Sequence, residues 1–163
     1  MIDNLIVITT GGTIDKIYYD AESDYQVGEP EIGRILEDVG ATFPWRVVPL
    51  MRKDSLEMDD SDRQRVRATV EQSNGRHFLV THGTDTMVET ARHLEHLNER
   101  VIVLTGALHP ARFIGSDAVF NIGCAVGAVQ CLDPGVYIVM NGGVWYPDQV
   151  RKNRARNRFE AIS

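Results

Sequence analysis

The sequence predicts a doubly wound α/β fold with a mainly parallel sheet, and two observations support this prediction. Five short apolar segments of strand length alternate with longer segments that show helical periodicity. Four of the five segments run into polar or glycine-containing motifs, which read TTGGT, KDS, THGTD and TGALHP. Because strands that alternate with helices form right-handed crossovers, we expect these four motifs to share the carboxyl edge of one sheet.

The first third of the chain is predicted to contain two strands, a loop and a short helix. Residues 5–9 are β-branched and apolar and run into glycine, as in a buried strand. Residues 15–31 are polar with little periodicity, so we expect a long loop that acts as a lid or binding loop. A short helix follows over residues 30–40. Pro49 places the second strand, residues 45–51, at the edge of the sheet or brings it to an end there.

The remainder continues the alternation of helix and strand. The helix over 116–132 is almost wholly apolar and rich in small residues, so we expect it to be heavily buried and to be a candidate for subunit contact. The predicted elements are a helix from Ser55 or Asp60 to 74–75, a strand over 77–83, a helix over 85–98, a strand over 101–106, the helix over 116–132, a strand over 135–144, and a basic, polar tail over 150–163.

Composition limits the classes of protein that the chain can represent. It has 163 residues, a length that suits one domain, and its formal net charge of -6 argues against a general nucleic-acid binder. No apolar run is long enough to span a membrane, and the N-terminus lacks the basic and apolar regions of a signal peptide. We therefore expect a cytoplasmic protein without a membrane partner.

Neither the cysteines nor the histidines form a recognisable ligand set. Cys124 and Cys131 lie two turns apart on one predicted helix, about 10 Å between Cα atoms, which is too far for a disulfide. We expect both to be small buried residues. The five histidines lack zinc-ligand spacing, and His82 is expected to have a structural role. The sequence thus predicts neither a metal nor a cofactor.

The motif TTGGTIDK allows three interpretations, namely a phosphate loop, a plain turn or a loop with a nucleophile. A phosphate loop is disfavoured because GGTIDK lacks the glycine before lysine and nothing matches G-x-G-x-x-G. A plain turn, with Thr13 as a cap, would account for one isolated loop. The second loop, THGTDT, adds Thr84 and Asp85 at the same edge. A threonine nucleophile needs a neighbour that takes its proton, and acyl transfer needs the backbone donors that glycines such as Gly12 and Gly83 bring close to a substrate.

The segments ITTGGTID and VTHGTDTMVETA resemble the two signature motifs of the bacterial-type L-asparaginase family. The segments LTGALHPARFIGSDAVFN and VYIVMN extend the resemblance over nearly the whole chain. It implies a flavodoxin-like sheet of the kind found in the larger N-terminal domain of that family. Residues 1–163 are therefore expected to form a single N-terminal-type domain, with the family's smaller C-terminal domain absent.

The resemblance implies that Thr13 is the nucleophile, next to the substrate-binding Gly12. Thr13 would attack the side-chain amide of L-asparagine, release ammonia and form an acyl-enzyme, which water then hydrolyses to aspartate. A tyrosine on the mobile loop assists in the family, and Tyr25 matches it. Tyr18 and Tyr19 are competing choices for this role.

The resemblance gives the second loop and the KDS motif binding roles. Thr84 would position or activate the attacking water, while Gly83 and Asp85 contact the substrate, Asp85 through its α-ammonium group. Capping of the following helix is the alternative role for Asp85. Ser55 matches the residue that binds the α-carboxylate. Leu56 replaces a glutamine found in many secreted members, from which we expect little glutaminase activity.

Two departures from the family pattern concern a lysine and an acid. The resemblance implies a lysine on the helix after the fourth strand, paired with the second threonine, but that helix contains none. Lys152 is the first candidate to replace it and Lys16 the second, with a solvated surface charge as the alternative role for Lys152.

The second departure is an acidic residue that the family's C-terminal domain contributes to the neighbouring subunit's site. Asp15, beside the nucleophile, and Glu22 and Asp24, on the expected lid, are possible replacements. An active site without that domain is expected to be more open and to bind its substrate weakly.

These features predict an L-asparaginase that works without a cofactor as a homodimer or homotetramer. Two other functions stay open, an ammonia-donating amidotransferase subunit and a non-catalytic amino-acid-binding domain. The basic stretch RKNRARNR could be a nucleic-acid arm, but packing against an acidic surface or a second subunit is favoured in a chain of net charge -6.

Overall fold

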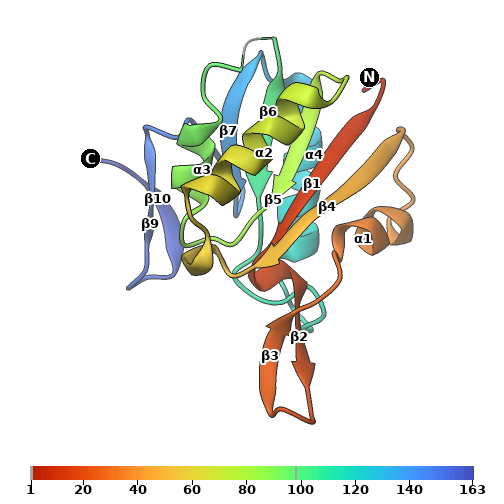
Figure 1. Ribbon diagram of the computed structural model, residues 1–163, viewed down its shortest axis with the longest axis vertical. Helices are drawn as coiled ribbons and strands as arrows, with labels where there is room; N and C mark the ends of the chain where they lie inside the picture. The colour runs from red at the N-terminus through yellow and green to blue at the C-terminus, as the bar shows by residue number, and fades with distance from the viewer. Residues whose placement is uncertain (1, 98) are drawn as a thin grey trace.

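A computed structural model of the chain describes residues 2–97 and 99–163 and shows a six-stranded sheet between two layers of helices (Figure 1). The strand order is β4-β1-β5-β6-β7-β8, in which the first five strands are parallel and β8 is antiparallel to β7. The predicted doubly wound α/β fold is therefore confirmed, in its flavodoxin-like strand order. The strands are β1 (Leu5–Gly11), β4 (Trp45–Lys53), β5 (His77–Thr81), β6 (Val101–Thr105), β7 (Gly135–Met140) and β8 (Gly143–Trp145).

Helices cover both faces of the sheet, which is why its central strands are apolar on both sides. Successive side chains of β1 point to opposite faces, so Val7 joins the core beneath α1 (Ile32–Asp38) and α4 (Ala118–Cys131), whereas Ile8 joins the other core. That second core lies beneath α2 (Asp60–Gln72) and α3 (Met87–His93).

The expected loop over residues 15–31 is largely a β-hairpin, so that prediction was wrong. Its strands are β2 (Lys16–Tyr19) and β3 (Asp24–Val27), and the hairpin projects from the carboxyl edge of the sheet (Figure 1). Tyr18 and Tyr25 are register partners whose ring centroids lie 5.2 Å apart. Cross-strand aromatic pairs of this kind stabilise a hairpin even when its sequence lacks a regular polar and apolar alternation.

Other boundaries differ from the prediction where turns interrupt the expected elements. The predicted strand over 135–144 is divided between β7 and β8 at Asn141 and Gly142, whose φ angles are 48° and 85°. An Asn-Gly pair with positive φ is typical of a tight hairpin turn. The helix predicted over 85–98 is shorter, since α3 ends at His93, and the end of that prediction, residue 98, lies outside the described residues.

The basic tail forms an antiparallel hairpin of β9 (Val150–Asn153) and β10 (Arg158–Ala161) beside α3 (Figure 1). Val150 and Phe159 are buried in the core beneath α2 and α3, which fixes the hairpin to the domain. The tail is thus an integral part of the fold. Most of its charged residues are exposed, but the Lys152 side chain is largely buried.

The helix α4 is less buried than predicted. One face, with Ala118, Ile122 and Ala125, lies in the core, but Val119 and Phe120 on the opposite face are exposed. The two cysteines of this helix are free, and only partial burial is seen for Cys124, while Cys131 is exposed, contrary to the expectation for both. Within residues 2–97 and 99–163, no helix combines the length and the apolar character needed to cross a bilayer.

Candidate active site

The two threonine loops lie at the point where the sheet's strand order reverses. The chain leaves β1 to form β4 on one side and later returns to form β5 on the other side. In open α/β sheets, ligands bind at such a switch point, beyond the carboxyl ends of the strands. The TTGGT and THGTD loops flank this crevice.

Glycine is required where these two loops touch. A Cβ added to Gly12, whose φ is 86°, would lie 2.4 Å from the backbone nitrogen of Gly83. A Cβ added to Gly83 would in turn lie 2.7 Å from the Oγ of Ser55. Since real Cβ atoms do not approach so closely, only glycine allows the backbones of three loops to meet here. The contacts bring Thr13, Thr84 and Ser55 to one place at the sheet edge.

Thr13 opens a short 3-10 helix, Thr13–Asp15, directly after the glycine pair. Two long-range hydrogen bonds hold the preceding residues. The Gly12 N–H donates to the Lys53 carbonyl at 2.9 Å, and the Thr10 hydroxyl donates to the Thr81 carbonyl at 2.9 Å. Thr13 is itself partly exposed, at the end of a loop that these hydrogen bonds hold in place.

Ser55 is buried beneath the second loop. It begins a 3-10 helix, Ser55–Glu57, after β4. The Thr86 N–H donates to the Ser55 Oγ at 3.3 Å, and the Thr86 hydroxyl donates to the Ser55 carbonyl at 2.8 Å. The predicted carboxylate-binding residue is therefore held by Thr86, whose part in the site the sequence did not indicate.

Lys152 reaches the second loop from β9. Its Nζ donates to the Thr84 Oγ1 at 2.7 Å and to the Asp85 Oδ1 at 2.8 Å. The Lys152 side chain is only 11% exposed. A lysine therefore does contact the second threonine. It comes from β9 and not from α4, and it is Lys152, the first candidate named from the sequence.

Asp85 does not cap α3. The residue at the N-cap position is Thr86, and no side chain makes a capping hydrogen bond there. The Asp85 carboxylate instead meets two cations, since Arg154 Nε lies 3.3 Å from the oxygen that also accepts from Lys152. The capping alternative is therefore wrong. Arg154 is a neighbour of the site that the sequence did not single out.

Tyr25 lies on β3, 44% exposed, and packs against Tyr18 and Phe113. It lines a cavity of about 400 Å³ together with Lys16 and Asp54. No hydrogen bond of its hydroxyl occurs within the described part of the chain. The structure places Tyr25 at the same sheet edge as Thr13, but its assisting role stays a prediction.

The second lysine candidate is engaged elsewhere. Lys16 Nζ lies 3.1 Å from the Asp54 carboxylate, at the end of β4. Asp54 is also the N-cap of the Ser55–Glu57 helix, where its side chain accepts from the Leu56 N–H. Lys16 therefore supports the loop that carries Ser55 and does not contact Thr84.

Two of the three proposed acidic replacements, Glu22 and Asp24, are exposed on the hairpin β2–β3.

Asp15, the third acidic candidate, is buried behind the nucleophile. Its Oδ1 accepts from the Glu31 N–H at 3.0 Å. Burial raises the pKa of Asp15 to about 7, and the negative charge of Glu31 adds to this, while the Glu31 N–H and Arg52 oppose it. Its carbonyl accepts from the Gly28 N–H at 2.8 Å, so Asp15 ties the base of the β2–β3 hairpin to the sheet edge.

His82 supports the second loop from its buried side. The fully buried ring has its Nδ1 2.6 Å from the Gly83 carbonyl and its Nε2 2.7 Å from the Thr90 hydroxyl. Since a carbonyl can only accept, Nδ1 carries the proton and Nε2 accepts from Thr90. Burial lowers the pKa of His82 to about 4. A neutral histidine in one tautomer thus orients Gly83, as the structural role predicted for it requires.

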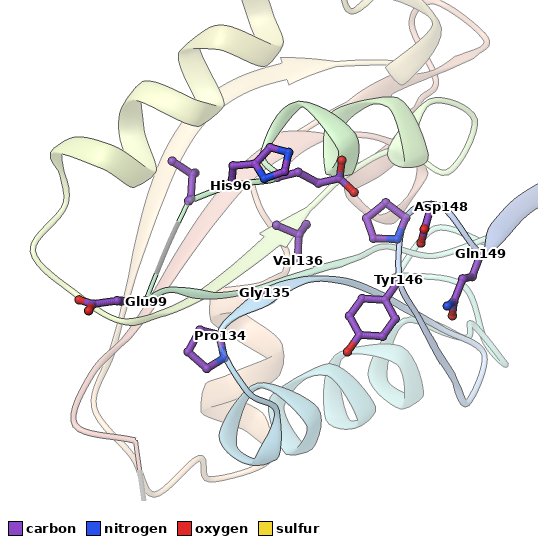
Figure 2. A pocket seen from close by; sticks show the side chains of 11 residues that line it. His96, Glu99, Pro134, Gly135, Val136, Tyr146, Asp148 and Gln149 are labelled. Atoms are coloured by element: carbon purple, nitrogen blue, oxygen red, sulfur yellow. The ribbon is translucent and has the colours of Figure 1, made fainter.

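A second cavity, of about 440 Å³, lies at the opposite edge of the sheet (Figure 2). Glu99 precedes β6 and Gly135 begins β7, so this cavity borders the amino ends of the strands. Figure 2 shows His96, Tyr146 and Asp148 around it. It contains none of the predicted site residues. Among residues 2–97 and 99–163, no three His, Cys, Asp or Glu side chains are grouped as metal ligands would be.

Comparison with known proteins identifies the family. The family model described as Asparaginase, N-terminal, matches residues 4–163. The chain belongs to the asparaginase family. The loops that meet through Gly12 and Gly83 both lie within the matched residues.

Relatives with known names support this assignment. L-asparaginase 2 of Escherichia coli is 29% identical over 157 residues, which cover 86% of this chain and 44% of that protein. A glutamyl-tRNA(Gln) amidotransferase subunit of Thermoplasma acidophilum is 30% identical over 126 residues, which cover 74% of this chain and 31% of that protein. The chain thus spans less than half of the length of these two relatives.

A solved structure shows the same fold. The structure of a probable cytoplasmic L-asparaginase from Campylobacter jejuni superimposes with a TM-score of 0.82 at 25% identity, covering 98% of this chain and 53% of that one. The asparaginase-type arrangement of strands and loops therefore extends over nearly the whole of this chain.

Proposed function

We propose that the chain is an L-asparaginase that hydrolyses L-asparagine to L-aspartate and ammonia through an acyl-enzyme on Thr13. The observation that carries this proposal is the contact of Lys152 Nζ with both the Thr84 hydroxyl and the Asp85 carboxylate, beside a glycine contact that brings Thr13 into the same crevice. Family membership supports the reaction class, and the roles of the individual residues are part of the proposal.

In the first step, the Thr13 Oγ attacks the side-chain amide carbon and loses its proton. The carbon–nitrogen bond then breaks, the nitrogen leaves as ammonia with that proton, and an ester joins Thr13 to the aspartyl group. Tyr25 is proposed to assist the proton transfer after the hairpin moves inward. The Gly12 N–H is engaged by the Lys53 carbonyl, so we propose that the oxyanion meets other N–H groups of the two loops, which the glycines allow to approach the substrate closely.

In the second step, water hydrolyses the ester. Because the Thr84 oxygen accepts from Lys152, the hydrogen of the Thr84 hydroxyl is directed to another group, which we propose is the attacking water. Water adds to the acyl carbon, the ester bond to Thr13 breaks, and aspartate leaves. A proton from the water returns to the Thr13 oxygen. Lys152 therefore positions Thr84.

The substrate's backbone groups would be held by Ser55 and Asp85, as the family resemblance implies. Leu56 is 60% exposed next to Ser55 and offers no polar contact. A preference for asparagine over glutamine is part of the proposal, and comparable turnover of the two amides would contradict it. Asparagine is proposed as a small-molecule partner of a homo-oligomer in the cytoplasm, and the support for that location is the name of the Campylobacter relative, a probable cytoplasmic L-asparaginase.

The direct test measures ammonia release from L-asparagine by the purified wild type and by Thr13→Ala. We expect activity in the wild type and a loss to background in the variant. Thr42→Ala, at an exposed threonine, is the matched control and should keep full activity. An inactive wild type would rule out the enzyme, and an active Thr13→Ala would rule out the nucleophile.

The second candidate is an ammonia-donating amidotransferase subunit, and the Thermoplasma relative favours it. Such a subunit would release ammonia from glutamine or asparagine chiefly with a bound partner protein. Affinity purification from native cells, followed by the same assay on the complex, separates the two functions. A stable partner that raises ammonia release would favour the subunit over the independent enzyme. A fully folded protein that releases no ammonia in either state would favour a non-catalytic amino-acid-binding domain.

A further inference from the structure

A third cavity, of about 270 Å³, lies beside Asp85 on the side away from the hairpin β2–β3, between α3 and the tail hairpin. Val88, Val150 and Ile162 provide its apolar lining. Asp85 and Lys152 belong both to this cavity and to the proposed active site. The cavity therefore adjoins the proposed site, and the proposed mechanism does not use it.

The cavity is positively charged in a protein of net charge -6. Four cationic side chains line it, against two carboxylates, which belong to Asp85 and Glu89. Both segments contribute, since α3 carries one of the cations and the tail hairpin the other three. The four are Arg92, Arg151, Lys152 and Arg154.

Two of these arginines retain binding capacity. Arg154 contacts Asp85 through Nε, and no hydrogen bond engages its terminal nitrogens within residues 2–97 and 99–163. Arg92 has no ion pair with any described carboxylate. By contrast, Arg151 is paired with Glu160 at 3.0 Å. Because a guanidinium has five donors in a fork that fits an oxyanion, Arg92 and Arg154 can each donate to an anion in the cavity that they line.

Asp85 is also poorly placed to accept a further cation from this side. Its Oδ1 already faces Lys152 and Arg154. A positively charged group entering the cavity would be repelled by these cations, whereas an anion would be attracted to them. The charge distribution of the cavity thus favours an anionic ligand.

We propose that this cavity binds a small oxyanion group, a carboxylate or a phosphate, next to the amide site. The group is either a free anion or the far end of an extended amide substrate. The apolar lining accommodates a short aliphatic chain that carries the group. The extended-substrate form rests on the proposed asparaginase function, whereas the binding of a free anion does not.

The binding test uses the Thr13→Ala protein, so that anion binding is measured separately from catalysis. Isothermal titration with inorganic phosphate and with succinate is compared among this protein and versions that also carry Arg92→Gln, Arg154→Gln or Arg156→Gln. Arg156 is exposed on the same hairpin outside the cavity, so its variant removes the same charge without touching the site. Circular dichroism confirms that each version is folded.

We expect each cavity variant to weaken anion binding about tenfold or more, since each removes a charge-assisted contact. Arg156→Gln should change it less than about twofold because Arg156 is exposed and does not line the cavity, so no direct contact with the anion is lost. Equal binding by all four proteins, or an equal loss in the control and the cavity variants, would overturn the proposal.

Kinetics with Thr13 intact then distinguish the two sources of the anion. If the anion is part of the substrate, a suitable probe is L-asparagine with a 2-carboxyethyl group on its α-nitrogen, which keeps the ammonium charge that Asp85 is proposed to bind. Arg154→Gln should raise KM for this compound about tenfold, with a smaller effect for L-asparagine. If the anion is free, phosphate should change the hydrolysis of L-asparagine by the wild type but not by Arg154→Gln. Absence of hydrolysis in the wild type would contradict the proposed function and leave the binding result standing.

Discussion

At the scale of residues, the contacts of Lys152 constrain the chemistry most. A side chain only 11% exposed places its Nζ within 2.8 Å of two oxygens, so its charge is directed at Thr84 and Asp85 and not at solvent. Such partly buried, charge-assisted hydrogen bonds are stronger than surface ion pairs. This is why the alternative of a solvated surface charge does not apply to Lys152.

Replacing Lys152 by methionine tests its role directly. Methionine keeps a chain of similar length but cannot donate to Thr84, so we expect kcat for L-asparagine to fall roughly 10²- to 10³-fold, in the range of a lost proton-transfer arrangement. Arg156→Met, an exposed position on the same hairpin, should retain wild-type kcat. Steady-state ammonia release measures both. A Lys152→Met protein with an unchanged kcat would exclude the lysine from the reaction.

The raised pKa of Asp15 predicts that the free energy of unfolding depends on pH. Its pKa is about 7 in the folded protein against 3.8 as the ordinary value, so the folded state binds the proton more tightly than the unfolded state does. Between these values, the free energy of unfolding must fall as pH rises. From pH 5 to pH 8 the contribution is about 2–3 kcal/mol, at roughly 1.4 kcal/mol for each pKa unit.

Asp15→Asn removes this titration and keeps an acceptor for the Glu31 N–H. We therefore expect the variant to become more stable than the wild type as pH rises from 5 to 8, as measured by urea unfolding. His82 has a lowered pKa and so acts in the opposite direction below about pH 6.5, but it is present in both proteins and cancels. Asp20→Asn, at an exposed position, should show no such trend. A stability difference that is independent of pH would contradict the prediction.

At the scale of elements, the site depends on backbones that touch. The loop after β1, the loop after β5 and the start of the Ser55–Glu57 helix meet at Gly12 and Gly83 with no room for a Cβ. The THGTD loop also abuts Gly106, where a Cβ would lie 2.3 Å from the His82 carbonyl oxygen. The glycines that follow β1, β5 and β6 therefore allow the loops to pack closely against one another.

Gly12→Ala tests the close contact between the loops, and Gly127→Ala in α4 serves as a control for the general effect of replacing glycine by alanine. The added Cβ would clash with the Gly83 backbone at a φ of 86°, so we expect a loss of about 2–4 kcal/mol in unfolding free energy and a large loss of activity. Gly127→Ala is the control, because Gly127 lies in α4 with nothing within 4 Å of an added Cβ. That variant should be more stable by about 0.5–1 kcal/mol. Thermal and urea unfolding measure both, and a neutral Gly12→Ala would contradict the close contact.

At the scale of the whole molecule, the tail hairpin connects the core to the site. Phe159 is 7% exposed in the core beneath α2 and α3, and its register partner on β9 is Lys152. The hairpin therefore places one side chain in the core and the other against Thr84. Because the two residues are paired across the hairpin, a loss of packing at Phe159 is expected to disturb the position of Lys152.

Phe159→Ala should reveal this coupling. Loss of a buried aromatic ring is expected to cost about 3–5 kcal/mol of unfolding free energy and to lower activity, because the hairpin that positions Lys152 loosens. Phe120→Ala, at a residue that is 59% exposed on α4, should change neither quantity appreciably. Urea unfolding and ammonia release are measured on the same preparations. A destabilised Phe159→Ala that keeps full activity below its unfolding transition would separate the hairpin from the site.

Much of the fold could be predicted because strands and helices are encoded by local periodicity. The alternation around residues 5–9, 77–83 and 101–106 predicted a parallel sheet, and Pro49 correctly indicated an edge strand. The β2–β3 hairpin was missed because its stability comes from the Tyr18–Tyr25 pair across the strands and not from alternation along them.

The sequence by itself determined the sheet type, the edge at which the predicted site residues lie and the two threonine loops, since these follow from short-range patterns and from the directions of parallel strands. Only the tertiary structure decided which lysine meets Thr84, that Asp85 faces Arg154 and does not cap a helix, and that Asp15 is buried. The physical reason is distance along the chain. Lys152 and Thr84 are 68 residues apart, and their contact depends on the packing of a hairpin against the core, which no local pattern specifies.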